Sequence, residues 1–249
     1  MIYFVGAGPG AEDLITMRGY RLLQSAKVVV YAGSLVNRQL LNACRGDCQI
    51  FDSAHMTLDE VIEVLAKHEA PGEVVVRLHT GDPSIYGAIR EQIDALRVLK
   101  LSFEIVPGVS SFFAAAAALE AEYTLPDVSQ TVIITRMAGR TPVPEKENMR
   151  LLAAHNSTMV IFLSVHKISV LCGELIAGGY SEETPAAIVY KASWPDQKVV
   201  RGTLSTLPAL SSGITKTALV LVGNFMGNEY SLSKLYDSSF THGYREAKQ

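Results

Sequence analysis

The sequence predicts an α/β protein of two domains, each built on a mostly parallel or mixed sheet. Short apolar runs of strand length recur along the 249 residues, and stretches of helical periodicity separate them. Glycine or proline follows several of these runs directly, as expected where buried strands end in loops. The alternation restarts after residue 112, which predicts domains at 1–112 and 113–249 with a cleft between them.

Composition narrows the functional classes. Hydrophobic residues make up 48% and charged residues 19% of the chain, so it can bury a large core. A net charge of -3 argues against a nucleic-acid surface. Cys44, Cys48 and Cys172 lack zinc-ligand spacing, so we expect no metal site and a reducing, cytoplasmic location. Because no apolar run is long enough to span a bilayer, we expect no membrane partner.

The first predicted strand, Ile2–Val5, leads into the glycine loop Gly6–Ala11 and then a helix. The loop satisfies the G-x-G-x-x-A pattern of dinucleotide sites. Pro9, however, removes a backbone N–H that would bind a pyrophosphate. The second strand, Lys27–Tyr31, ends at Ala32 instead of the acidic residue such sites require. An NAD(P)-binding oxidoreductase therefore remains only an alternative.

The next elements are a predicted helix over Leu35–Cys44 and a strand over Gln49–Asp52. Thr57 followed by Glu60 is a capping box, which predicts that a helix begins there. His55 lies just before this helix. It is either a solvated loop histidine or a residue that faces a ligand.

A third strand, Glu73–Arg77, opens into the stretch Leu78–Gly87, with the sequence LHTGDPSIYG. Ligands of α/β proteins usually bind at the carboxyl ends of strands. Gly81 can adopt backbone angles closed to other residues, and Pro83 stiffens the turn, so Asp82 is held on a short loop. The pattern fits either a binding site or a common surface turn.

A helix over Tyr86–Lys100 and a strand over Ser102–Val106 complete the first domain. The turn Pro107–Ser111 follows, and the alanine-rich run Phe112–Leu119 predicts a tightly packed helix. The strands predicted for the second domain are Thr131–Thr135, Ser157–Leu163, Ala186–Tyr190, Lys198–Gly202 and Ala218–Val222. The segment Arg136–Arg150 is either a cationic lid or a solvated loop. Aromatic residues along the tail from Gly227 suggest docking on a neighbouring surface, such as a dimer partner.

Five segments carry a resemblance to a known family. They are Gly6–Ala11, Tyr31–Val36, Gly81–Gly87, Pro107–Ser111 and Lys216–Gly223. In this order, over essentially the whole chain, they resemble the tetrapyrrole methylases, two-domain S-adenosylmethionine (SAM) enzymes of corrin and sirohaem synthesis. Tyr31–Val36, Asp52–Leu58 and Thr135–Pro144 resemble the corrin-branch members that methylate C-11 of the macrocycle. The resemblance implies a tetrapyrrole substrate, cobalt-loaded or metal-free, a homodimer, and S-adenosylhomocysteine as product.

The resemblance also implies a SAM site in the cleft between the domains. The residues expected to hold the methionine part are Thr80, Gly81, Asp82 and Ile85. Ser110 and Ser111 are expected to make another contact with SAM, and Pro9 is expected to lie near it. Asp82 would accept a hydrogen bond from the ammonium group or act through the loop amides. Leu163, Ala192 and Ala218 are expected to pack against the adenosine.

A substrate trough is implied along the glycine loop, with Gly8 and Gly10 lining it. The candidate cations for the substrate carboxylates are Arg136, Arg140 and Lys191. The candidates for the reacting edge are Tyr31, Ser34, His55 and Thr57. Sirohaem-type members have an aspartate where this chain has Ala32, so no catalytic base is assigned. A tetrapyrrole carrier without catalysis is a further alternative, but it leaves the GDPSIYG and PGVSS loops unexplained.

Overall fold

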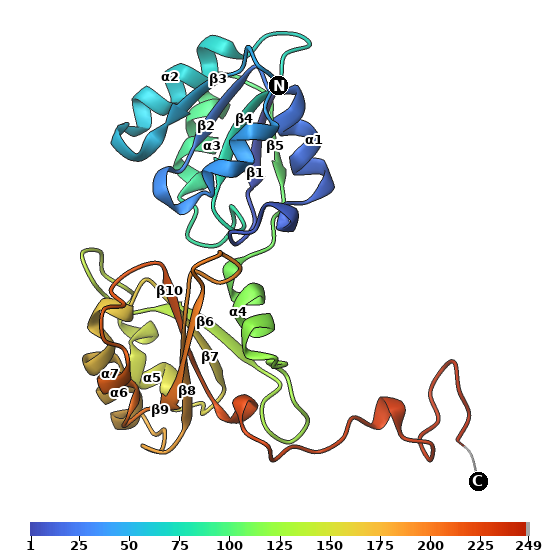
Figure 1. Ribbon diagram of the computed structural model, residues 1–249, viewed down its shortest axis with the longest axis vertical. Helices are drawn as coiled ribbons and strands as arrows, with labels where there is room; N and C mark the ends of the chain where they lie inside the picture. Colours follow the sequence, from blue (N-terminus) through green and yellow to red (C-terminus); the bar gives the residue numbers. More distant parts are fainter. Residues whose placement is uncertain (248–249) are drawn as a thin grey trace. The chain divides into compact units, whose positions relative to one another are not determined.

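The computed structural model describes residues 1–247, except for the side chain of Ser34 (Figure 1). The chain forms two compact units. The first contains Met1–Ala114 together with Lys191–Asp196, and the second contains Ala115–Tyr190 and the residues from Gln197. The short segment Lys191–Asp196 thus packs with the first unit although it lies far along the sequence.

The first unit is built on a parallel sheet of five strands (Figure 1). In spatial order the strands are β3 (Gln49–Asp52), β2 (Val28–Tyr31), β4 (Val75–His79), β1 (Ile2–Gly6) and β5 (Phe103–Val106). Every neighbouring pair is parallel. The carboxyl ends of the strands therefore share one edge, and the loops that follow them emerge side by side there.

Helices cover both faces of this sheet. Side chains of α1 (Met17–Ser25) and of the 3₁₀ helix Arg38–Ala43 pack on one face. Side chains of α2 (Leu58–His68) and α3 (Ile89–Val98) pack on the other. The helix predicted over Leu35–Cys44 is therefore of the tighter 3₁₀ type. The capping box of α2 is confirmed, since both of its reciprocal hydrogen bonds are present.

The two elements that flank the loop after β4 differ from their predicted positions. The helix predicted from Tyr86 begins only at Ile89, because Tyr86 and Ala88 have left-handed φ angles of 54° and 49°. Strand β4 continues to His79, two residues beyond the predicted end. The loop after β4 therefore starts at Thr80 and ends in two strained residues, a feature common at functional sites.

The second unit has a mixed sheet, as predicted. Its strands in spatial order are β6 (Val132–Arg136), β7 (Thr158–Phe162), β10 (Ala218–Val222), β8 (Pro185–Tyr190) and β9 (Lys198–Thr203). Strands β6 and β7 are parallel, and the other neighbouring pairs are antiparallel. The helix α4 (Ser111–Leu119) leads into this unit from the first.

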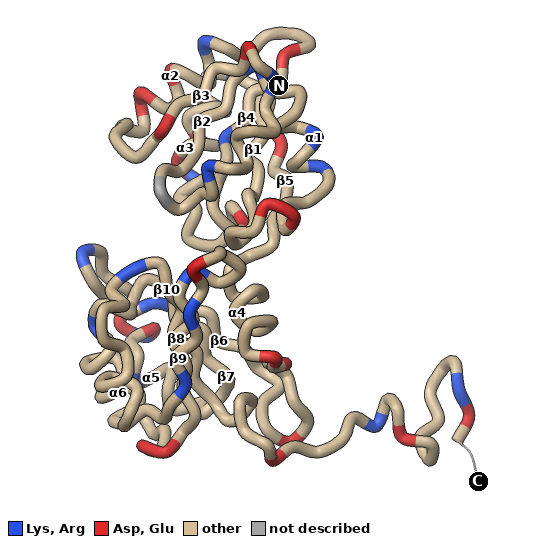
Figure 2. Tube along the Cα trace, viewed as in Figure 1, with Lys and Arg blue, Asp and Glu red and all other residues tan. Residues whose placement is uncertain are grey.

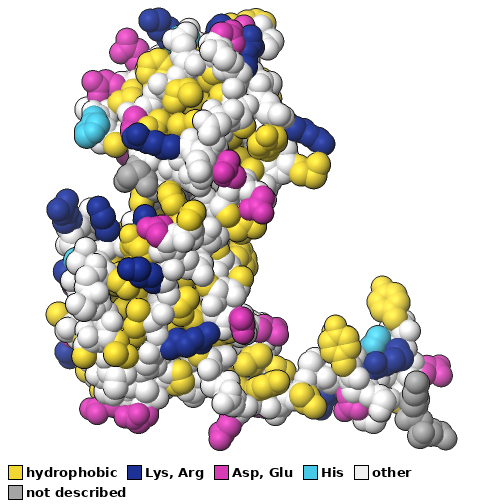
Figure 3. Space-filling view, viewed as in Figure 1, with side chains coloured by type: hydrophobic (Ala, Val, Ile, Leu, Met, Phe, Trp, Pro, Cys, Tyr) yellow, Lys and Arg dark blue, Asp and Glu magenta, His cyan; other side chains and the backbone are white. Residues whose placement is uncertain are grey.

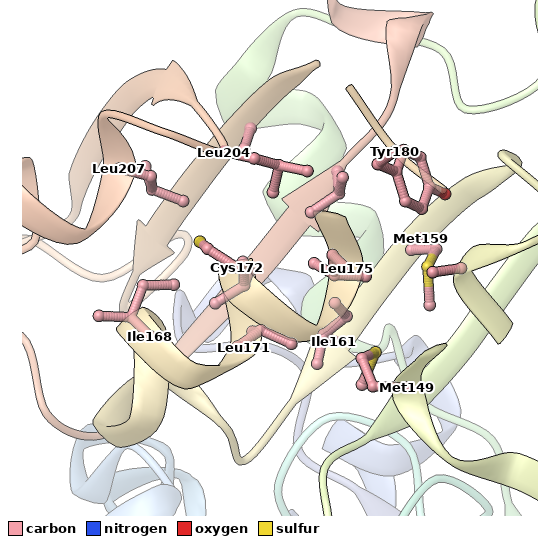
Figure 4. Close-up of a cluster of buried hydrophobic side chains, with 14 of the residues drawn as sticks. Met149, Met159, Ile161, Ile168, Leu171, Cys172, Leu175, Tyr180, Leu204 and Leu207 are labelled. Atoms are coloured by element: carbon pink, nitrogen blue, oxygen red, sulfur yellow. The ribbon is translucent and has the colours of Figure 1, made fainter. Parts of the chain in front are cut away.

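The core of the second unit lies between this sheet and three helices (Figure 4). These are α5 (Met149–Ala153), α6 (Ile168–Ala177) and α7 (Leu207–Leu210). Leu171 and Leu175 of α6 are fully buried against the sheet. Each such side chain contributes roughly 1.5–3 kcal/mol by leaving water, so α6 anchors the unit.

Buried polar side chains link the first sheet to α3. The guanidinium of Arg77, in β4, donates to Gln92 Oε1 at 3.0 Å and to the Val30 carbonyl at 3.1 Å. Gln92 Nε2 in turn donates to the Ala88 carbonyl at 3.1 Å. The network thus connects β2 and β4 to the left-handed residue that ends the loop after β4, and it fixes where α3 begins.

His79 belongs to the same layer and is a buried side chain that can titrate. Its ring stacks on Phe4 with centroids 6.0 Å apart, and its buried Nε2 has no hydrogen-bond partner among the described residues. Burial, and secondarily the charge of Arg77, lowers the pKa of His79 to about 3. An unfolded histidine titrates with a pKa of about 6.5, so below that pH the unfolded chain binds a proton that the folded chain does not.

We therefore expect His79 to reduce the free energy of unfolding as pH falls from about 6.5, at up to about 1.4 kcal/mol per pH unit. Between pH 7 and pH 5, wild type should lose about 2 kcal/mol more than His79→Phe. Urea denaturation at both pH values measures this difference, and His166→Gln, a change on the surface, controls for the loss of one histidine. Equal losses in wild type and His79→Phe would contradict the prediction.

Candidate functional site

Three loops meet at the carboxyl edge of the first sheet, and glycines allow them to touch. Gly81 N–H donates to the Gly8 carbonyl at 2.8 Å, and Gly8 N–H donates back to the Gly81 carbonyl at 3.3 Å. A Cβ on Gly6 would lie 2.5 Å from Gly108 Cα. A Cβ on Gly108 would lie 2.2 Å from the Gly81 carbonyl oxygen. The loops after β1, β4 and β5 thus approach backbone to backbone, where no larger residue fits.

Asp82 connects two of these loops. Its Oδ2 accepts from Gly108 N–H at 2.8 Å, and its Oδ1 accepts from Ser84 N–H at 2.8 Å and from the Ser84 hydroxyl. Burial acts to raise the pKa of Asp82, but these hydrogen bonds outweigh it and hold the pKa below its usual value. Of the two predicted roles, an action through the loop amides is the one this geometry favours.

The other candidates for the methionine part lie on the same loops. Thr80 and Ile85 are half-buried on the loop after β4, and Ile85 N–H donates to the Asp82 carbonyl at 3.3 Å. Ser110 is buried and Ser111 half-buried where the loop after β5 enters α4. The Cβ position of Gly81 lies 3.5 Å from both Ser110 Cα and Ser111 N. The structure therefore brings together candidates that lie up to about thirty residues apart in the sequence.

The candidates for adenosine contact lie elsewhere. Leu163 follows β7, is 61% exposed and has a φ of 54°. Ala218, at the start of β10, pairs with Tyr190, and the β10–β7 register places it level with Leu163. Leu163 and Ala218 thus share one edge of the second sheet. Ala192 is buried and belongs to the first unit. Contact of these three residues with adenosine stays a prediction.

A contact that the sequence did not reveal holds the glycine loop. Trp194 Nε1 donates to the Pro9 carbonyl at 2.9 Å, and Ala11 N–H donates to Ser193 Oγ at 3.0 Å. On the same loop, Asn37 Nδ2 donates to the Gly10 carbonyl at 2.8 Å. These partners lie up to 185 positions apart in the sequence. The one available signal was that Trp194 is the only tryptophan of the chain.

Tyr31, a candidate for the reacting edge, is the last residue of β2. It belongs to a hydrogen-bond network that was not predicted from the sequence. Its hydroxyl donates to Asp52 Oδ2 at 2.8 Å, and the exposed Arg38 lies 3.3 Å from the same oxygen. Burial, followed by the interaction with Asp52, raises the pKa of Tyr31. A backbone hydrogen bond from Ala54, followed by the Tyr31 hydroxyl, lowers the pKa of Asp52. The Tyr31 hydroxyl therefore stays protonated at neutral pH and donates its proton to Asp52.

The remaining reacting-edge candidates have different positions. His55 and Thr57 are exposed just after β3, at the same edge of the sheet. The side chain of Thr57 caps α2, which is a structural use of its hydroxyl. The side chain of Ser34 lies outside the described part of the structure.

The three candidate cations are also placed differently. Arg136 donates to the carbonyls of Met137, Thr141 and Pro142, so it shapes its own loop. Arg140 is exposed on that loop. Lys191 Nζ lies 2.7 Å from Asp196 Oδ2. Two of the three predicted carboxylate-binding cations thus have protein partners of their own.

Among residues 1–247, no group of three or more histidine, cysteine, aspartate or glutamate side chains is placed to hold a metal ion. Within the same range, no helix has the length and apolar character needed to cross a membrane.

Comparisons with known proteins place the chain in a family. Residues 1–208 match the model of the Tetrapyrrole (Corrin/Porphyrin) Methylases. A relative from Methanocaldococcus jannaschii, a cobalt-precorrin-4 C(11)-methyltransferase, is 55% identical over 249 residues, which cover 99% of this chain and 96% of the relative.

Solved structures agree with this assignment. The X-ray structure of a cobalamin biosynthetic enzyme, cobalt precorrin-4 methyltransferase, is 47% identical with a TM-score of 0.89, covering 91% of this chain and 96% of that one. Uroporphyrin-III C-methyltransferase from Thermus thermophilus, complexed with S-adenosyl homocysteine, is 26% identical with a TM-score of 0.75, covering 91% and 93%. The chain therefore belongs to the tetrapyrrole (corrin/porphyrin) methylase family.

Proposed function

We propose that this chain is a SAM-dependent methyltransferase that adds a methyl group to C-11 of cobalt-precorrin-4 in the anaerobic route of cobalamin biosynthesis. The observation that carries the proposal is the similarity, over nearly the whole chain, to a relative with this activity. The three-loop contact at the carboxyl edge of the first sheet supports it, because family enzymes need a shaped site for SAM.

The residues present fit SAM. The loops after β1, β4 and β5, which pack backbone to backbone at Gly6, Gly81 and Gly108, form the proposed cradle for SAM. Thr80, Ile85 and Ser111 border this cradle and are our candidates for holding the methionine part. When bound, SAM supplies a methyl group attached to a sulfonium sulfur, and the sulfur keeps the electron pair of the C–S bond when the ring carbon attacks the methyl group.

The contribution of the protein is mainly positional. Holding a carbon and a methyl group in line at contact distance lowers a barrier by roughly 7–11 kcal/mol. Asp82 fixes the loop after β4 against the loop after β5 and so fixes the cradle. Because the Tyr31 hydroxyl already donates its proton to Asp52, we assign it as a hydrogen-bond acceptor at a polar edge of the macrocycle and propose no general base. To test that role, the KM for the macrocycle is measured in the Tyr31→Phe variant and compared with that of wild type.

The test of the proposal is mass spectrometry of cobalt-precorrin-4 incubated with SAM and the purified protein. We expect a gain of one methyl group, located at C-11 by NMR. Faster turnover of metal-free precorrin-4 would instead assign the aerobic reaction. Macrocycle binding with no measurable SAM affinity would indicate a carrier, and binding of NAD(P) without methylation would indicate the oxidoreductase alternative.

We further propose a cytoplasmic homodimer. The odd number of cysteines supports a reducing compartment, which cell fractionation tests. The C-terminal tail from Gly227 supports the dimer, since it presents apolar side chains among charges of both signs (Figures 2 and 3). Leu232 and Tyr236 are 82% and 83% exposed. Docking of the tail on a second copy would cover such side chains.

Removal of the residues after Gly227 is expected to shift the protein from dimer to monomer. The physical reason is the loss of the apolar contacts that the tail would make with the second copy. Sedimentation velocity at micromolar concentration measures the change, and Leu232→Ser/Tyr236→Ser is the milder variant. A truncated protein that stays fully dimeric would exclude the tail from the interface.

A further inference from the structure

The segment Lys191–Asp196 lies on the glycine loop, and its contacts fall on consecutive peptide groups. Trp194 binds the Pro9 carbonyl, and Ser193 binds the N–H of Ala11. The Gly10 carbonyl between them is held by Asn37. Since a glycine loop has few side chains of its own to fix it, these three outside contacts fix its second half, Pro9–Ala11.

The segment is itself closely held. Lys191 and Ser193 have left-handed φ angles of 46° and 69°, which non-glycine residues adopt only where the surroundings impose them. Lys191 and Asp196 form an ion pair at 2.7 Å across the segment. The Lys191 ammonium also lies 5.2 Å from the centre of the Trp194 ring. Strain and cross-bridging together indicate a segment built to hold Trp194 in one orientation.

Gly10 and Trp194 fit each other closely. A Cβ added to Gly10 would lie 2.1 Å from Trp194 Cδ1 and 2.2 Å from its Nε1. The indole therefore fills the space in which any larger residue at position 10 would place its side chain. The fit makes the two residues a matched pair that a double-mutant cycle can test.

We propose that Lys191–Asp196 is a latch that holds the glycine loop in the conformation that receives the flat face of the tetrapyrrole, with Trp194 as its positioning residue. The identity of the ligand rests on the proposed function, whereas the latch itself rests on the contacts above. A loop fixed before binding loses less conformational entropy when a rigid macrocycle settles on it. The latch should therefore affect macrocycle affinity far more than SAM affinity.

The first experiment compares wild type with Trp194→Ala, Gly10→Ala and the double variant. Trp194→Ala is expected to raise the KM for cobalt-precorrin-4 about tenfold, with kcat and SAM affinity within about twofold of wild type. Gly10→Ala should have a larger effect, because its Cβ overlaps the indole. The double variant should be no worse than Trp194→Ala, since the cavity left by the indole accepts the new methyl group. If the effects of the two single substitutions on the KM simply multiply in the double variant, Gly10 and Trp194 are not a matched pair.

Two milder variants keep the test decisive if Trp194→Ala folds poorly. Trp194→Phe retains an aromatic ring but lacks the N–H donor to Pro9, and Ser193→Ala removes the acceptor of the Ala11 N–H. Each should raise the KM by a smaller factor with an unchanged melting temperature. Tyr20→Ala, at an exposed aromatic residue of α1, is the matched control and should behave as wild type. A lower kcat at constant KM in the latch variants would indicate general destabilisation and reject the proposal.

A second readout does not depend on activity. Amide hydrogen exchange of the Ala11 N–H should become at least about tenfold faster in Ser193→Ala and Trp194→Phe than in Tyr20→Ala. If wild type fails to methylate the macrocycle but exchange accelerates, the proposed function is wrong and the latch stands. If methylation proceeds while exchange and KM stay as in wild type, the latch is wrong.

Discussion

Replacing Gly108 with alanine is expected to disrupt the three-loop contact and to lower the rate of methyl transfer by at least about a hundredfold. The new Cβ would lie 2.2 Å from the Gly81 carbonyl oxygen and 2.7 Å from Gly6 Cα. Both neighbours are backbone atoms, so neither can move aside by a simple side-chain rotation. The loops after β1 and β4 must instead shift away from the loop after β5, and a displacement of about 1 Å suffices for a loss of that size.

The same strain should lower the free energy of unfolding by about 3 kcal/mol, at the upper end of typical overpacking costs. The Asp82–Gly108 hydrogen bond would be weakened as well, because its donor belongs to the displaced residue. Urea denaturation gives the stability, and SAM titration with single-turnover kinetics gives the function.

Gly46→Ala is the matched control, since nothing lies within 4 Å of its Cβ position and it belongs to the same unit. It should leave both stability and activity near wild type. If Gly108→Ala behaves like this control, the close approach of the three loops has no functional importance.

The strands could be predicted from the sequence because most of their side chains are buried and apolar. Strand β10 was predicted residue for residue, since Leu219–Val222 are all buried. Strand β4 was predicted two residues too early, at Glu73–Arg77 instead of Val75–His79, because His79 is polar and yet buried. The sequence alone does not show that Gln92 satisfies Arg77 or that His79 stacks on Phe4. Burial of a polar residue depends on partners that periodicity does not show.

The site was predictable as separate loops but not as an assembly. Glycine and proline mark the loops after β1, β4 and β5, since these residues punctuate strand ends. Which loop touches which depends on strand order, and β1 lies between β4 and β5 although all of β2 and β3 intervene in the sequence. The Asp82–Gly108 and Trp194–Pro9 contacts follow from that order and from long-range packing. Sequence spacing contains no information about either contact.

Asp82 provides the second large effect. Asp82→Asn is expected to weaken SAM binding about a hundredfold and to lower the free energy of unfolding by no more than about 1–3 kcal/mol. Asparagine has a single acceptor oxygen in place of two. If that oxygen stays on the Ser84 N–H, the amide NH₂ faces the Gly108 N–H, and this half-buried donor loses its partner at a cost of up to about 1–3 kcal/mol. The loops after β4 and β5 would then separate and open the cradle.

The pH dependence of this effect has a definite sign. The folded-state pKa of Asp82 lies below its usual value, so its stabilising contribution is fully present above the unfolded pKa of about 3.9. That contribution is lost only as pH falls through the lower, folded pKa. Measurements near pH 7 therefore compare a fully ionised Asp82 with the neutral variant. Ser84→Ala, which removes only the hydroxyl donor, should weaken SAM binding less than about tenfold.

A pair of ligands separates the two possible roles of the carboxylate. S-adenosylhomocysteine and its analogue without the amino group differ only in the ammonium that Asp82 would contact directly. If Asp82 acts through the loop amides, Asp82→Asn weakens both ligands by the same factor, and calorimetric titrations should show this. If the loss is confined to the ligand that carries the ammonium, the carboxylate binds that group directly. Because both carboxylate oxygens already accept hydrogen bonds from the loops, we expect equal losses.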